Sequence, residues 1–180
     1  MAGFTLWFTG LSGAGKTTIA EFVRPELEGR GLLVEWLDGD VARTHLTKGL
    51  GFSKEDRDTN VERLAWVASR LTRHGAAVVV SAISPYEATR RKARALVEES
   101  GAFVEVHVAT PVEECERRDV KGLYEKARAG EIPGFTGVSH PYEEPANPEL
   151  RIDTTEHEPE ESARLVIAKL EELGILGVTA

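Results

Sequence analysis

The sequence predicts an α/β protein with a parallel sheet of about five strands, helices on both faces and a lid. Strand and helix signals alternate along the chain, which is the pattern of a parallel sheet. The central strand candidates are near-continuous apolar runs, as expected where helices cover both faces of a sheet. A glycine-rich turn follows the first of them. The candidate strands are residues 4–9, 33–37, 77–82, 103–108 and 150–152.

The 180 residues are expected to form one domain, 1–180, with one substantial core. Three helix starts are marked by a hydroxyl residue. Ser53 precedes an acidic first turn, and Ser84 and Thr110 each begin a capping-box pattern that includes proline. The last helix is predicted over about 159–173.

One irregular segment interrupts the alternation of strands and helices. Residues 128–148 contain seven glycines and prolines, and long irregular stretches in compact domains are usually lids or binding loops. We therefore predict a lid or substrate loop over about 118–148.

Composition excludes several classes of partner. The formal net charge of -8 argues against binding a nucleic-acid backbone, although a local cluster of Arg and Lys could still bind small anions. No apolar run reaches the ~18 residues of a membrane span. The first strand begins without a secretory signal, and the single cysteine, Cys115, cannot form an internal disulfide. A cytoplasmic protein is expected, with Cys115 as a packed thiol.

The glycine-rich turn is a P-loop. Residues 10–17 read G-L-S-G-A-G-K-T between a strand and a helix, so backbone N–H groups and the helix N-terminus can surround phosphate oxygens. Lys16 adds a charge at the β- and γ-phosphates, where the chemistry occurs, and the Thr17 hydroxyl is the expected magnesium ligand. A P-loop NTPase-type fold that binds a nucleoside triphosphate follows. The residues expected to bind this nucleotide are Gly10, Leu11, Ser12, Gly13, Ala14, Gly15, Lys16, Thr17 and Thr18.

Two further carboxylates point to catalysis. Asp38 and Asp40 end the second strand, and ligands collect at the carboxyl ends of parallel strands. Facing a P-loop from the neighbouring strand, they can hold a magnesium-bound water and accept a proton from an attacking hydroxyl. Strand 77–82 lacks the usual acidic Walker B residue, so magnesium would depend on Thr17, the phosphates and water held by Asp38 or Asp40.

Arg57 and Asn60 share one face at the start of a helix. Together they could clamp an anion and hydrogen-bond a base or ribose. Taken alone, the pair fits a solvated helix face better.

A series of motifs then resembles the adenylylsulfate kinases, in the right order over nearly the whole chain. Beside the P-loop they are D-G-D-V-A-R (38–43), L-G-F-S (50–53), R-D-T-N (57–60), I-S-P (83–85), R-D-V-K-G-L-Y (118–124) and I-P-G-F-T-G (132–137). The resemblance implies transfer of the γ-phosphate of ATP to the 3′-hydroxyl of adenosine 5′-phosphosulfate, giving 3′-phosphoadenylylsulfate. Such enzymes are usually homodimers.

The same resemblance implies roles for single residues. Arg43, Arg57 and Asn60 would contact the nucleotide sulfate, Phe52 and Phe135 would sandwich its adenine, and Lys121 would approach the phosphates from the lid. Ser84 matches a serine that is described as a phosphorylated intermediate in some relatives. The substrate site is completed by Asp40, Ile83, Ser84, Pro85 and Leu123, and the ATP site by Arg118.

Several alternatives stay open. Another small-molecule P-loop kinase would share residues 10–17 and Asp40 without needing L-G-F-S or R-D-V-K-G-L-Y. A nucleotide-binding regulatory module would not need the intact Lys16 and Thr17. Ser84 could be a covalent intermediate or a helix cap, but the sequence offers no base beside it. We therefore expect direct transfer, with Asp40 as the base or orienting group.

Overall fold

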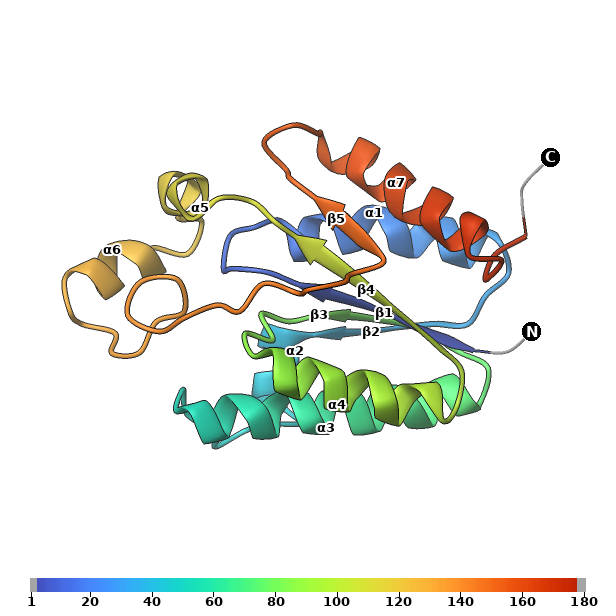
Figure 1. Ribbon diagram of the computed structural model, residues 1–180, viewed down its shortest axis with the longest axis horizontal. Helices are drawn as coiled ribbons and strands as arrows, with labels where there is room; N and C mark the ends of the chain where they lie inside the picture. The colour runs from blue at the N-terminus through green and yellow to red at the C-terminus, as the bar shows by residue number, and fades with distance from the viewer. Residues whose placement is uncertain (1–2, 178–180) are drawn as a thin grey trace.

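The computed structural model describes residues 3–177, so the ends of the predicted domain, 1–2 and 178–180, lie outside the described residues. A five-stranded parallel sheet in the order β2-β3-β1-β4-β5 forms the centre of the molecule (Figure 1). The predicted strands are confirmed to within one residue at either end. They are β1 (Phe4–Thr9), β2 (Val34–Asp38), β3 (Ala77–Ser81), β4 (Ala102–Val108) and β5 (Leu150–Ile152).

Helices cover both faces of the sheet, as predicted (Figure 1). One face carries α1 (Lys16–Gly29) and α7 (Pro159–Glu172), and the other carries α3 (Lys54–Arg73) and α4 (Glu87–Glu98). Each face has its own core, so Leu6 and Leu64 pack on opposite sides of the sheet. Within residues 3–177, every helix is too short or too polar to cross a lipid bilayer.

Three short helices surround the carboxyl edge of the sheet. Helix α2 (Gly39–Thr44) continues directly from β2, while α5 (Val112–Arg118) and α6 (Leu123–Arg128) project beyond the sheet together with the irregular segment (Figure 1). The carboxyl ends of the parallel strands therefore face these helices and the segment that was predicted as a lid.

The strand order corrects one expectation. β2 was expected beside the P-loop strand β1, but β3 lies between them and pairs in parallel with both. In this register Ser81, at the end of β3, stands opposite Asp38 on one side and Phe8 on the other. Ser81 therefore lies between the end of β2, where Asp38 stands, and the end of β1, where the P-loop begins.

Only one of the three predicted hydroxyl caps is present. Ser53 caps α3, since its Oγ accepts the Asp56 N–H at 3.0 Å. The capping box at Ser84 is wrong: α4 begins at Glu87, whose N–H is bound by Glu143 Oε2 at 2.8 Å. The cap at Thr110 is also wrong, because its hydroxyl donates to the Ala14 carbonyl at 2.7 Å instead.

Candidate active site

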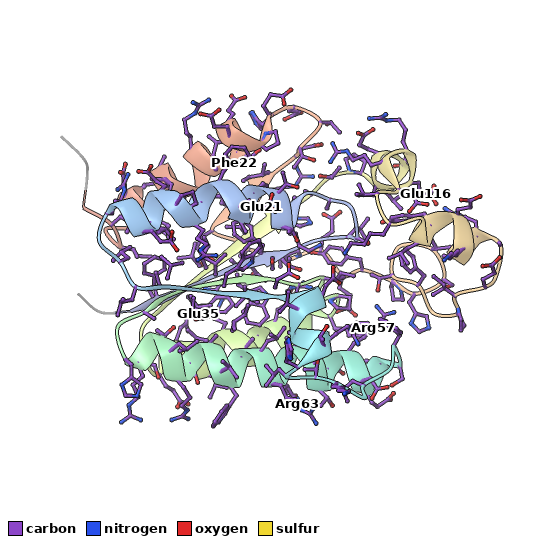
Figure 2. The ribbon with its side chains drawn as sticks, turned by 180° about the vertical axis from the view of Figure 1, so that it is seen from behind. Glu21, Phe22, Glu35, Arg57, Arg63 and Glu116 are labelled. Carbon is purple, nitrogen blue, oxygen red and sulfur yellow. The ribbon has the colours of Figure 1, made fainter. Side chains whose placement is uncertain are left out.

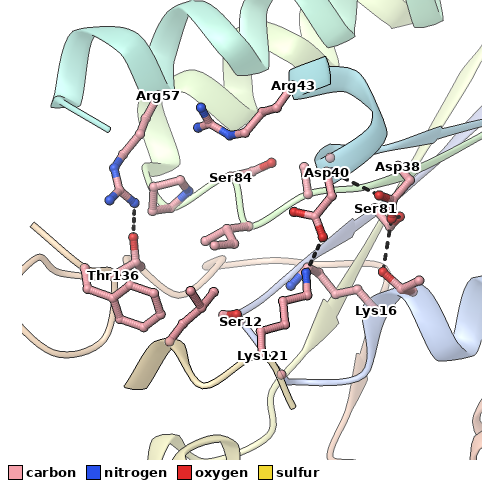
Figure 3. A pocket seen from close by; sticks show the side chains of 18 of the residues that line it. Ser12, Lys16, Asp38, Asp40, Arg43, Arg57, Ser81, Ser84, Lys121 and Thr136 are labelled. Atoms are coloured by element: carbon pink, nitrogen blue, oxygen red, sulfur yellow. Dashed lines mark hydrogen bonds and ion pairs between the residues drawn. The ribbon is translucent and has the colours of Figure 1, made fainter. Parts of the chain in front are cut away.

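A cleft of about 650 Å³ opens at the carboxyl edge of the sheet (Figure 3). Its walls come from the P-loop, α2, the start of α3, residues 83–85 and the segment 118–148, which was predicted to act as a lid and is called the lid below. The predicted site residues that line it are Ser12, Gly13, Gly15, Lys16, Thr17, Thr18, Asp38, Asp40, Arg43, Phe52, Arg57, Asn60, Ile83, Ser84, Pro85, Arg118, Lys121, Leu123 and Phe135. Gly10, Leu11 and Ala14 belong to the same P-loop but are not part of this lining.

The P-loop needs glycine at two tight positions. Gly13 has a φ of 75°, which L side chains rarely adopt, and a Cβ on Gly10 would lie 2.5 Å from the Val108 carbonyl oxygen. Lys16 folds back over this loop and donates to the carbonyls of Gly10 at 2.8 Å and Leu11 at 2.7 Å. Burial of the Lys16 ammonium lowers its pKa to about 8. The side chain is thus held beside the loop where phosphates would supply a compensating negative charge.

The Asp38 carboxylate accepts four hydrogen bonds at the edge of the cleft. Its Oδ1 accepts the N–H groups of Asp40 at 3.0 Å and Val41 at 3.3 Å, which caps α2. Its Oδ2 accepts the hydroxyls of Thr17 at 3.1 Å and Ser81 at 3.0 Å (Figure 3). The carboxylate is therefore fixed in place next to the P-loop threonine.

These oxygens fit a magnesium ion that is shared with phosphates. Mg²⁺ is usually held by one or two protein oxygens, with phosphates and water filling the remaining positions. Thr17 and Asp38 provide such a pair. Within residues 3–177 there is no group of three or more His, Cys, Asp or Glu side chains that could hold a metal ion.

Asp40 and Lys121 join α2 to the lid. The Asp40 side chain is 70% exposed and forms an ion pair with Lys121 Nζ across the cleft (Figure 3). An exposed ion pair of this kind contributes little to stability. The contact can therefore be exchanged for a ligand at low cost, which leaves the Asp40 carboxylate available to an incoming group.

Arg57 is buried, contrary to the solvated face that its spacing alone favoured. It points from α3 toward the lid, whereas Arg63, further along the helix, lies on the outer side (Figure 2). Its guanidinium donates to Thr136 Oγ1 and the Gly134 carbonyl of the lid, and its Nε donates to the Phe52 carbonyl at 2.8 Å. Arg57 thus connects the start of α3 to the lid.

Asn60 is buried beside Arg57, with only 7% of its surface exposed, and its Oδ1 has no hydrogen-bond partner among the described residues. A buried polar atom of this kind costs free energy unless a ligand or water satisfies it. Asn60 thereby offers an unused acceptor at the cleft wall.

Two aromatic rings line the same part of the cleft. Phe52 is 56% exposed, and the Arg43 guanidinium lies 4.4 Å from its ring centroid. Phe135 is buried, with its ring edge-to-face against Tyr124 at 5.0 Å. The two aromatic rings and the guanidinium groups of Arg43 and Arg57 suit a nucleotide, whose planar base can stack on the rings while its anionic groups bind the guanidinium groups.

Ser84 occupies an unusual backbone position. Its φ is 48°, and its Oγ accepts the Trp7 indole N–H at 3.1 Å. The side chain is buried, and among residues 3–177 no carboxylate or imidazole is hydrogen-bonded to its hydroxyl. Its hydroxyl is therefore oriented by a donor rather than activated by a base.

Sequence reasoning missed several residues of the site. Thr154 Oγ1 donates to the Ala14 carbonyl at 3.1 Å and accepts from Arg118 Nη1 at 2.8 Å, so it joins the P-loop to α5. Its position two residues after β5, at the carboxyl edge, was an available signal. Thr154 lies outside the cleft lining, to which Val61, Ser81, Val120, Ile132 and Thr136 do belong. Thr136 and Ile132 lie in the I-P-G-F-T-G motif and Val120 lies in R-D-V-K-G-L-Y, whereas Val61 resembles an ordinary core residue in the sequence.

Comparisons with known proteins agree with this geometry. A model of the adenylylsulphate kinase family matches residues 2–153. An adenylyl-sulfate kinase of Picosynechococcus is 58% identical over 174 residues, which cover 97% of each chain. The solved APS kinase of Mycobacterium tuberculosis, in complex with AMPPNP and APS, superposes with a TM-score of 0.91 at 47% identity, covering 94% of this chain and 98% of that one.

A hexameric APS kinase from Thiobacillus denitrificans superposes with a TM-score of 0.76 at 40% identity, covering 97% of this chain and 30% of that longer chain. The family model and these relatives span nearly all of the sequence, including the P-loop and every wall of the cleft. The chain therefore belongs to the adenylylsulfate kinase family.

Proposed function

We infer that this protein transfers the γ-phosphoryl group of ATP to the ribose 3′-hydroxyl of adenosine 5′-phosphosulfate and so produces 3′-phosphoadenylylsulfate. One observation carries the inference: a single cleft joins the P-loop, with Lys16 and Thr17, to a second wall that contains Arg43 and Phe52. The relative with TM-score 0.91 was solved with AMPPNP and APS together, which supports two nucleotides in such a cleft.

Product identification tests this function directly. The purified protein with magnesium, ATP and adenosine 5′-phosphosulfate should form ADP and 3′-phosphoadenylylsulfate, detected by chromatography and mass spectrometry. ATP without an acceptor should be consumed slowly. Transfer to a sugar acid or to shikimate instead would identify another small-molecule kinase, and the absence of any transfer would favour a regulatory nucleotide-binding module.

ATP is proposed to bind with its phosphates on residues 10–17 and its base toward Arg118. The helix N-terminus and the loop N–H groups would bind the phosphates, and Lys16 would neutralise their charge. Magnesium, when bound, would neutralise the developing charge at the transferred phosphoryl group. The Thr17 hydroxyl would hold it directly, and Asp38 would hold it through water.

The acceptor nucleotide is proposed to bind on the opposite side of the cleft. Arg43 and Arg57 would bind the phosphosulfate, and Asn60 Oδ1 would accept a hydrogen bond from the base or ribose. The adenine would stack between Phe52 and Phe135. Residues 83–85 and Leu123 would complete the wall, and the lid over about 118–148 would close on both nucleotides and bring Lys121 to the phosphates.

Direct transfer is the route that we propose. The 3′-hydroxyl oxygen would attack the γ-phosphorus while the bond from that phosphorus to the bridging oxygen of ADP breaks. Asp40 would accept the hydroxyl proton or orient the hydroxyl. The alternative route through Ser84 would need a base, and Ser84 Oγ instead accepts a hydrogen bond from Trp7. Ser84 is accordingly assigned to the wall of the acceptor site.

Truncation of Phe52 tests the stacking site. Because Phe52 is 56% exposed, Phe52→Ala should leave the fold intact and weaken binding of adenosine 5′-phosphosulfate by about 1–3 kcal/mol, with ATP binding unchanged. Trp66→Ala is the matched control, since Trp66 is equally exposed but lies outside the cleft. Calorimetry with each nucleotide measures both affinities. An equal loss of affinity for the two nucleotides would show that Phe52 does not belong specifically to the acceptor site.

Substitutions at Asp40 and Ser84 separate the two routes. Asp40→Asn should reduce kcat by about a hundredfold or more, because it removes the proton acceptor, whereas Ser84→Ala should keep substantial activity. Stereochemical analysis with a chiral γ-phosphate should show inversion after one displacement. Retention of configuration, or a folded but inactive Ser84→Ala, would establish the covalent route instead.

A homodimer in the cytoplasm completes the proposal. The resemblance to a usually dimeric family supports the dimer, and the hexameric relative supports self-association in general. Light scattering should give twice the mass of one chain. A monomer mass at micromolar concentration would refute the dimer without affecting the proposed chemistry.

A further inference from the structure

Arg90 on α4 is almost completely buried, although it does not line the cleft. Its side chain is 1% exposed, and its guanidinium is bound on several sides. Nη1 donates to the Ser84 carbonyl at 2.7 Å, and Nη2 donates to Glu87 Oε2 and to the Glu143 carbonyl, each at 2.6 Å. Nε lies 3.1 Å from Glu105 Oε1. Two of these contacts reach backbone carbonyls outside α4.

The first of these carbonyls belongs to the segment 83–85, which lines the acceptor side of the cleft. Ser84 holds a positive φ that is costly for a residue with a side chain, so its surroundings must maintain it. Its carbonyl accepts from Arg90 and, at 3.3 Å, from Thr9 Oγ1. Buried donors on the far side from the cleft therefore hold this segment in shape.

The second carbonyl belongs to a strap formed by residues 142–149, which packs behind 83–85. Glu143 N–H donates to the Pro85 carbonyl at 2.8 Å, and the Tyr142 hydroxyl lies 2.8 Å from Thr9 Oγ1. At its other end the strap is anchored by Glu149, which pairs with Arg94 at 2.8 Å. Arg90 lies where the strap, α4 and the 83–85 segment meet.

We propose that Arg90 is a positioning residue for the acceptor nucleotide. It holds Ser84 and the strap together, so that residues 83–85 present a fixed wall to adenosine 5′-phosphosulfate. This inference rests on the proposed function. An arginine is required because its planar fork donates to two carbonyls and to the Glu87 carboxylate while it forms an ion pair with Glu105, which a lysine cannot do. Since 83–85 belong to the acceptor side, the effect falls on that nucleotide rather than on ATP.

Arg90→Lys tests the assignment, with Arg94→Lys as the matched control. Arg94 lies one turn further along α4, approaches the same Glu105 at 3.7 Å and anchors the strap. Its hydrogen bonds and ion pairs within the described part of the chain go to Glu98, Phe103, Glu105 and Glu149, not to residues 83–85. Arg90→Lys should raise KM for adenosine 5′-phosphosulfate about tenfold to a hundredfold, with KM for ATP changed by less than about twofold. Arg94→Lys should change neither KM by more than about twofold, whatever its melting temperature.

Tyr142→Phe provides a second measurement if Arg90→Lys does not fold. It removes only the hydroxyl that binds Thr9, and it should produce the same selective rise in KM to a smaller extent. A variant that raises both KM values alike, or neither, overturns the positioning role, and so does a selective rise in Arg94→Lys. If the wild-type protein does not phosphorylate adenosine 5′-phosphosulfate at all, the proposed function has failed rather than this inference.

Discussion

The carboxylate of Asp38 is the contact on which the geometry of the site depends. It accepts four hydrogen bonds that come from α1, α2 and β3, and it lies at the end of β2 itself. The four donors are two backbone N–H groups of α2 and the hydroxyls of Thr17 and Ser81, all at the carboxyl edge of the sheet. The Asp38 carboxylate therefore fixes both the position of Thr17 and the direction of α2. Asp40 and Arg43 then project from α2 into the cleft. Displacement of this one side chain would disturb both nucleotide sites.

Local sequence patterns predicted the elements well but failed where a distant partner competed. The P-loop and the five strands follow from short-range spacing, so they could be recognised. Ser84 and Thr110 satisfy the local rule for helix caps, yet Trp7 binds the first hydroxyl and Ala14 accepts from the second. Both partners come from β1 and the P-loop, far away in the sequence. A capping pattern predicts the hydrogen bond of a hydroxyl only where no partner from elsewhere in the chain competes for that hydroxyl.

Local sequence patterns also could not predict which charged side chains are buried. Arg57 and Asn60 have the spacing of a solvated face, but residues 134–136 of the lid fold over Arg57. Arg90 belongs to the run R-R-K-A-R, which resembles an exposed basic helix face, and one of its members is nevertheless enclosed by carboxylates. For Arg57 and Asn60 the R-D-T-N motif, rather than periodicity, indicated that the segment was functional, whereas no motif marked Arg90.

The buried ammonium of Lys16 links nucleotide binding to proton uptake. In the free protein its pKa is lowered to about 8, so part of the population carries an uncharged amine at mildly alkaline pH. The arrival of anionic phosphates favours the charged form and raises that pKa again. Binding of an anionic phosphate above neutrality should therefore draw a fraction of a proton from the solvent. The apparent affinity for such a ligand should then depend on pH, and its heat of binding should vary with the ionisation enthalpy of the buffer.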